Sequence, residues 1–134
     1  MITLDDYWMG RDKQFPLNLT AEIKTNAQIT VTRANLILSQ FKQATGDTSQ
    51  RKVTSGWRPP MINAITKNAA PNSKHMTGQA VDISDPDGDL DEWCLANRTY
   101  LEGAQLWQEH PSATKGWCHL QIVPPKSGNR VFYP

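Results

Sequence analysis

The chain has 134 residues, of which 38% are hydrophobic and 20% are charged, and its formal net charge is +1. This length predicts one domain with its own core, and the near-neutral charge argues against a dedicated nucleic-acid binder or a polybasic membrane-surface protein. Because of this charge we expect no nucleic-acid binding, and because no apolar run approaches the length of a membrane span we expect no membrane insertion.

The N-terminal third of the chain predicts one long helix. Thr20 is a suitable N-cap, and Gly46 is a suitable stop. Apolar residues recur between them every three or four positions, at Ile23, Ala27, Val31, Ala34, Leu38 and Phe41. The β-branched run over 29–32 weakens intrinsic helicity, so packing must stabilise this helix.

Short elements are predicted next. Arg51–Trp57 has the composition of a strand, which ends at the paired prolines after Arg58 because proline cannot donate to a strand ladder. Met61–Thr66 predicts a short helix, and Gln79–Ile83 predicts a second strand.

An acidic turn over 85–89 follows the second strand. It differs from a calcium loop because its glycine falls at the fourth position and no glutamate stands at the twelfth. Asp89 and Glu92 instead predict a capping box for a helix that runs to about Tyr100 and ends at Gly103.

Two more strands, Ala104–Glu109 and Trp117–Val123, are predicted around a loop over 110–116. The expected fold class is therefore α+β, with a small antiparallel sheet flanked by helices. We expect a single domain over 1–134, with a helical portion over about 1–46 and a sheet-bearing portion over about 51–134.

The first residues contain no basic segment leading into an apolar stretch, so we expect synthesis in the cytoplasm without a signal peptide. In that compartment Cys94 and Cys118 are expected to be reduced thiols rather than one bridge. If Trp117–Val123 is a strand, Cys118 points away from the face that carries His119.

Two histidines and an aspartate are the most informative residues. His75 and Asp82 lie seven positions apart around Gly78, and His119 follows in a predicted strand. Two imidazoles and one carboxylate form a three-ligand zinc set that leaves a fourth position for water. Asp82 also interrupts an apolar strand, where an unpaired charge is costly. On spacing alone, ordinary packed or surface residues are an equal alternative.

Several motifs occur together in a specific order. They are Ser55-Gly56-Trp57-Arg58-Pro59-Pro60, Asn63, Ser73-x-His75-x-x-Gly78-x-Ala80-x-Asp82 and Trp117-x-His119. This set resembles the zinc D-Ala-D-Ala carboxypeptidase and L-alanyl-D-glutamate endopeptidase family, which includes bacterial wall-trimming peptidases and phage endolysins. The resemblance covers Val53–Val123, about half of the chain. It implies a Hedgehog/DD-peptidase-like α+β fold with one zinc ion, and hydrolysis of peptide bonds next to D-amino acids in peptidoglycan stem peptides.

The resemblance implies that His75, Asp82 and His119 are the zinc ligands. His110 is the remaining histidine and an alternative to His119. It ranks lower because it precedes Pro111 in a predicted loop, whereas a strand gives His119 the rigid support that a metal ligand requires.

The general base departs from the pattern of the family. Many members carry a glutamate three residues before the last histidine, where this chain has Gly116, and others carry a histidine where it has Trp117. Glu109, at the end of a predicted strand, is the remaining candidate for the base. The alternative is that Glu109 is a solvated surface residue.

Arg58, Ser73 and Gln79 are the predicted substrate-binding residues. The guanidinium of Arg58 suits a substrate carboxylate or a developing oxyanion, although without the resemblance a surface arginine is the simpler interpretation. Ser73 and Gln79 are expected to hydrogen-bond the peptide, and Ser73 has the alternative role of shaping the turn before His75. The tryptophans near these segments, Trp57, Trp107 and Trp117, are expected to be core or pocket wall.

Three classes of function follow. The first is an active, monomeric zinc peptidase of phage or prophage origin, which reaches the peptidoglycan after holin-type release or from a virion. The second is a wall-peptide binding module without turnover, for which the absence of a glutamate at Gly116 is the support. The third is a phage structural or assembly protein that docks through Met1–Phe15.

Overall fold

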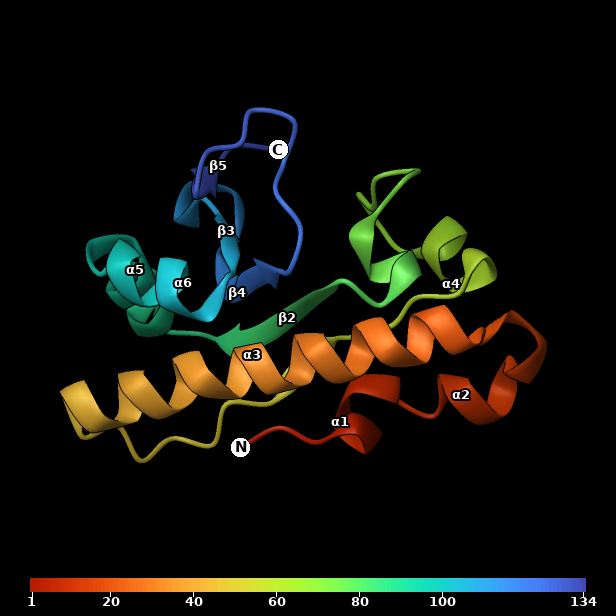
Figure 1. Cartoon of the computed structure of the whole chain (residues 1–134), viewed down its shortest axis with the longest axis horizontal. Coiled ribbons are helices and arrows are strands. Elements are labelled where there is room, and N and C mark those ends of the chain that lie inside the picture. The colour runs from red at the N-terminus through yellow and green to blue at the C-terminus, as the bar shows by residue number, and fades with distance from the viewer.

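One long helix spans the width of the molecule in the computed structural model, which describes residues 1–134 (Figure 1). This helix, α3 (Ala21–Thr45), begins after Thr20, whose side chain accepts a backbone N–H of the first turn. It ends at Gly46, which has a left-handed φ of 72°. Both limits confirm the prediction. The β-branched run packs against the rest of the molecule: Val31 belongs to the hydrophobic core, and the buried Thr30 hydroxyl lies 2.7 Å from the carbonyl oxygen of Gly78.

The other helices are short. They are α1 (Leu4–Trp8), α2 (Arg11–Gln14), α4 (Pro60–Ile65), α5 (Asp89–Ala96) and α6 (Arg98–Ala104), with the 3-10 turns η1 (Pro16–Asn18), η2 (Lys74–Thr77) and η3 (Pro111–Ala113). In Figure 1, α1 and α2 lie below α3 and the strands β2, β3, β4 and β5 lie above it, while α1 also contacts β1. No helix, α3 included, combines the length and apolar character that a membrane span requires.

The sheet has five strands in the order β1-β2-β4-β3-β5. They are β1 (Val53–Ser55), β2 (Ala80–Asp85), β3 (Trp107–Glu109), β4 (Gly116–Gln121) and β5 (Val131–Phe132). The α+β class is confirmed. The expectation of a wholly antiparallel sheet is wrong at one edge, because β5 pairs with β3 in parallel. The loop after β4 returns the chain to this edge, so that β5 runs in the same direction as β3. The sequence did not predict β5, because a strand of two residues is too short to show an alternating pattern.

The predicted strand Arg51–Trp57 is shorter than expected. The N–H of Trp57 donates to the carbonyl of Tyr7. The guanidinium of Arg51 pairs with the buried carboxylate of Asp85 at 2.7 Å. Only the three residues of β1 remain in the sheet.

The single helix that was predicted to end at Gly103 is two helices. The break lies at Asn97, whose side-chain amide donates to the carbonyl of Trp93 instead of continuing the helix. Gly103 lies inside α6, and Gln105 closes that helix with a left-handed φ of 55°. The predicted strand from Ala104 therefore begins only at β3.

The predicted capping box of Asp89 and Glu92 is wrong. Asp89 is the first residue of α5 and not its cap. The carboxylate of Asp85 caps the helix instead, because it accepts the N–H groups of Leu90 and Asp91 at 3.0 and 2.8 Å. The last residue of β2 therefore stabilises the start of α5.

Alternation along β2 and β4 divides the sheet into an apolar face and a polar face. Val81, Ile83, Cys118 and Leu120 are buried in the core with residues of α3 and α5. The neighbouring residues in sequence, including His119, face the other side. Cys118 therefore points away from His119 as predicted, and both cysteines are buried free thiols.

The N-terminal segment is part of the core. Tyr7 is fully buried, Trp8 is 8% exposed, and the Tyr7 hydroxyl donates to the carbonyl of Ala80 at 2.8 Å. The aromatic rings that suggested docking through Met1–Phe15 are therefore buried within the molecule, apart from Phe15, which is half-buried.

Candidate metal centre

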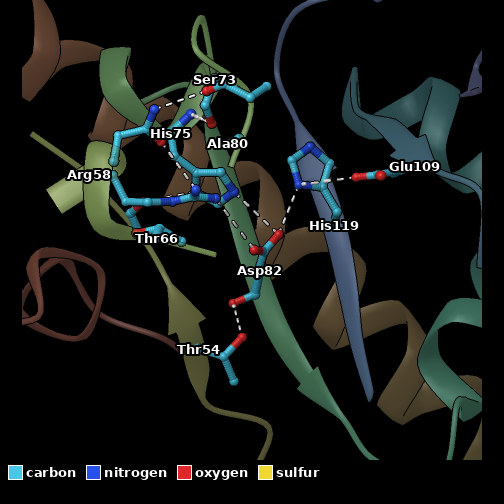
Figure 2. Close-up of polar contacts among 12 residues, drawn as sticks. Thr54, Arg58, Thr66, Ser73, His75, Ala80, Asp82, Glu109 and His119 are labelled. Atoms are coloured by element: carbon cyan, nitrogen blue, oxygen red, sulfur yellow. Dashed lines mark hydrogen bonds and ion pairs between the residues drawn. The ribbon is translucent and has the colours of Figure 1, made fainter. Parts of the chain in front are cut away.

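His75, Asp82 and His119 meet on the polar face of the sheet, where one ligand atom of each lies within 4.8 Å of the others (Figure 2). Asp82 and His119 are directly opposite in the antiparallel pair β2–β4, so their side chains share one face. His75 lies in η2, which precedes β2, and the left-handed Gly78 closes that turn. The three predicted ligands are therefore brought together.

The buried ring of His75 presents a free nitrogen to the cluster. Its Nδ1 lies 2.8 Å from the carbonyl oxygen of Gly56, which can only accept, so Nδ1 carries the proton. Its Nε2 lies 3.3 Å from Asp82 Oδ1 and is buried without a hydrogen-bond partner. Burial lowers the pKa of His75 more than the charge of Asp82 raises it, so the neutral form that binds metals is favoured.

His119 contacts two acceptors. Its Nδ1 lies 2.8 Å from Asp82 Oδ1, and its Nε2 lies 2.9 Å from Gln121 Oε1. Burial alone would lower the pKa of His119, but the hydrogen bond and charge of Asp82 raise it above the usual value. The ring of Phe132, from β5, lies in an edge-to-face arrangement with the imidazole, with 6.2 Å between the ring centroids.

Asp82 is an ionised carboxylate at the centre of the cluster. Burial favours its neutral form, but the charges and hydrogen bonds of His75 and His119 outweigh burial and lower the pKa of Asp82 well below its usual range. Two imidazoles and one carboxylate, with a buried nitrogen that lacks a partner, fit a divalent metal ion. The three residues could therefore hold such an ion.

Glu109 lies beside this cluster. Trp107 pairs with Gln121 in β3–β4, and two steps along the same register bring Glu109 to His119. Its Oε2 is 3.9 Å from His119 Nδ1, and its side chain is 19% exposed, so the alternative of a solvated surface residue is wrong. Burial raises the pKa of Glu109, although His119 opposes this shift. Figure 2 shows Glu109 on the far side of His119 from Asp82.

Arg58 approaches the cluster from the opposite side (Figure 2). It is 7% exposed, so the interpretation as a surface arginine is wrong. Its Nη1 donates to Asn63 Oδ1 at 3.2 Å, and its Nη2 lies 4.0 Å from Asp82 Oδ2. The Nε–H is buried without a partner.

The other predicted residues differ in their positions. Ser73 caps η2 and accepts the N–H of His75 at 3.2 Å, which is the turn-shaping role that the sequence left open. Gln79 accepts the hydroxyl of Thr77 at 2.6 Å and is not part of the cluster. His110 contacts Ser112 and stacks on an exposed tyrosine, so it does not replace His119.

Sequence reasoning missed three residues at this site, namely Gly56, Gln121 and Phe132. Gln121 carried a usable signal, because a residue two positions after His119 in a strand shares its face. The role of Gly56 depends on its backbone carbonyl, which has no side-chain signal. Phe132 lies in the strand β5 that the sequence did not predict.

One surface pocket lies away from the cluster. It has a volume of about 470 Å³ and is lined by residues of α1, α2, η1 and α3 and by Leu19, none of which belongs to the cluster. The candidate site is therefore identified by the chemistry of its donor groups and not by the size of a pocket.

No family model, no curated protein and no solved structure compared with this chain matches it. The resemblance to the zinc peptidases therefore rests on the ordered motifs, and the site is interpreted from the positions of its own atoms.

Proposed function

We propose that this protein is a zinc-dependent peptidase that hydrolyses peptide bonds next to D-amino acids in peptidoglycan stem peptides. The observation that carries the proposal is the free Nε2 of His75, which is buried and faces Asp82 within a cluster that His119 completes. A three-ligand set of this composition leaves a coordination position open, as catalytic zinc sites do. One zinc ion is the proposed cofactor.

Each nearby side chain has a part in this reaction. His75, Asp82 and His119 would hold a zinc ion, which would lower the pKa of a water molecule toward ~7 and make hydroxide available at neutral pH. Glu109 accepts the proton, because its carboxylate lies 3.9 Å from His119 and its raised pKa makes it a better base than an exposed glutamate. Arg58 binds a carboxylate or an oxyanion of the substrate through its buried and incompletely paired guanidinium.

The peptidoglycan substrate and a phage or prophage origin are inferred from the ordered motifs. We propose a monomer that acts on the cell wall after holin-type release or from a virion. Gln79 and Ser73 stay proposed contacts of the stem peptide, although Ser73 is engaged with the N–H of His75. Neither nucleic acid nor membrane insertion has a part in this function.

A wall-peptide binding module without turnover is the second candidate, and the absent glutamate at Gly116 is its support. In the structure Gly116 pairs with Asp85, three residues along the strand pair from the Asp82–His119 pair. Glu109 lies nearer to His119 and supplies a carboxylate there. The position of Glu109 favours the active enzyme.

Digestion of purified peptidoglycan tests the proposal directly. We expect the zinc-loaded protein to release D-alanine or stem-peptide fragments, and a chelator to abolish that release until zinc is restored. His75→Ala should be inactive, whereas His110→Ala, a matched change outside the cluster, should stay active. Binding of wall peptide without any release of fragments would support the second candidate. A protein that neither binds zinc nor releases fragments would contradict the proposed function.

A further inference from the structure

The two imidazoles of the cluster present different nitrogen atoms to Asp82. His75 approaches through Nε2 and His119 through Nδ1. A neutral imidazole has a proton on one nitrogen and a lone pair on the other. The hydrogen-bond partner outside the cluster decides whether Nδ1 or Nε2 carries the proton. For His75 that partner is the carbonyl of Gly56. For His119 it is the side chain of Gln121.

The orientation of the Gln121 amide follows from its second contact. Its Nε2 donates to the carbonyl of Val123 at 2.8 Å, so Oε1 is the atom that faces His119 Nε2 at 2.9 Å. The flipped amide would place two oxygen acceptors together at Val123, which is unfavourable. Gln121 is 5% exposed, so little water is available to replace these bonds. An oxygen that can only accept therefore faces His119 Nε2.

The competing tautomer of His119 carries its proton on Nδ1. That proton would be donated to Asp82 Oδ1, 2.8 Å away, and Nδ1 would then have no lone pair for a metal ion. The same tautomer would leave the lone pair of Nε2 against Gln121 Oε1, where two acceptors repel. Gln121 therefore disfavours the tautomer that competes with metal binding.

We propose that Gln121 is a positioning residue that makes Nδ1 of His119 the metal donor. This inference rests on the metal binding in the proposed function and not on peptide hydrolysis. The backbone of Gln121 remains paired with Ala80 and Trp107 in the sheet whatever its side chain. A substitution at this position therefore changes the partner of the imidazole and leaves the strand ladder in place.

Metal affinity measures the effect of the side chain. We expect Gln121→Leu, which cannot accept a hydrogen bond, to lower the affinity for Zn²⁺ roughly 10- to 100-fold in competition with a chromogenic chelator. Gln121→Glu retains an acceptor and should recover most of that loss. Gln43→Leu, the same chemical change on the exposed part of α3, should leave the affinity unchanged. Equal affinities of the native protein and Gln121→Leu would overturn the inference.

Cadmium NMR identifies the donor atoms on the native protein, so the test does not depend on the folding of a variant. With ¹¹³Cd²⁺ and ¹⁵N-labelled histidine, we expect couplings from the metal to His75 Nε2 and His119 Nδ1. A coupling to His119 Nε2, or no binding of cadmium, would overturn the inference. A protein that shows the expected couplings but leaves peptidoglycan intact would retain the role of Gln121 and lose the proposed activity.

Discussion

At the scale of single residues, Asp82 has the strongest influence on the site. A buried carboxylate is costly unless charges and hydrogen bonds compensate it, and here two imidazoles and the guanidinium of Arg58 surround it. Their charges and hydrogen bonds keep the pKa of Asp82 low despite burial. The side chain is therefore anionic over the whole physiological pH range and places a carboxylate between two imidazoles.

Glu109→Gln tests the proposed role of Glu109 as the general base. The variant keeps the shape of the side chain but cannot take up a proton, so cleavage of wall peptide should fall at least about 100-fold. Zinc content should not change, because Glu109 is outside the ligand cluster. Turnover and bound zinc are measured on the same samples, with the exposed Glu102→Gln of α6 as the matched control. Unchanged turnover would eliminate Glu109 as the base.

Asp91 predicts a dependence of stability on pH away from the site. Burial raises its pKa, although hydrogen bonds from Thr114 and Gln108 oppose the shift. The folded protein then holds a proton that the unfolded chain releases, so the native protein loses stability as the pH rises from about 4 through the raised pKa. Asp91→Asn removes this titration. The free energy of unfolding of Asp91→Asn minus that of the native protein should therefore increase over this window and stay constant below it.

Urea unfolding at a series of pH values measures that difference. The loss of hydrogen bonds in Asp91→Asn shifts the whole curve by a constant amount, whereas the titration changes its slope. A difference that is independent of pH would show that Asp91 has no raised pKa in the folded protein.

At the scale of elements, three adjacent strands arrange the site in one row. Asp82 on β2 lies opposite His119 on β4, and β3 brings Glu109 to the other side of His119. Side chains directly opposite in a sheet have Cβ atoms about 5 Å apart, which suits side chains that share one ion or one water. The register of the strands therefore decides which acidic residue reaches the candidate metal centre.

The link between β2 and α5 gives a prediction about stability. Asp85 pairs with Arg51 at 2.7 Å and caps α5, so Asp85→Ala leaves a buried charge without its main partner. The free energy of unfolding should fall by about 3–5 kcal/mol. Asp89→Ala removes only a charge from the first turn and should cost about 0.3–1 kcal/mol. Equal losses in denaturant titrations would contradict the assignment of Asp85 as the cap.

At the scale of the whole molecule, the site depends on the packing of the N-terminal segment. The Gly56 carbonyl that orients His75 lies where the chain passes α1, and Trp57 donates its N–H to the carbonyl of Tyr7. A Cβ on Gly56 would overlap the carbonyl oxygen of Tyr7. Only glycine therefore permits this close approach, which couples α1 to the candidate metal centre.

Metal binding should stabilise the folded protein, because His75, Asp82 and His119 converge only in the native structure. At zinc concentrations about 100 times the dissociation constant, the free energy of unfolding should rise by roughly 2.7 kcal/mol. His75→Ala should lose most of this gain, and His110→Ala should keep it. Thermal unfolding with and without zinc measures the effect. An equal gain in the native protein and His75→Ala would place the metal elsewhere.

The amino-acid sequence alone was sufficient for the features that depend on neighbouring residues. The long helix follows from its apolar period, with Thr20 and Gly46 at its ends, and these signals lie within one or two turns of the helix. The alternation of β4 likewise predicted that Cys118 and His119 face opposite sides. Ordered motifs indicated His75, Asp82 and His119 as one group, and the structure brings them together.

Tertiary structure decided the features that join distant segments. The parallel strand β5, the capping of α5 by Asp85 and the closeness of Glu109 to His119 all depend on the register and path of the chain. The partners of the two imidazoles, the Gly56 carbonyl and the Gln121 amide, are chosen in the same way. These contacts form because buried polar groups need hydrogen-bond partners once the core has packed. A local pattern of residues does not indicate which distant groups will then be unpaired.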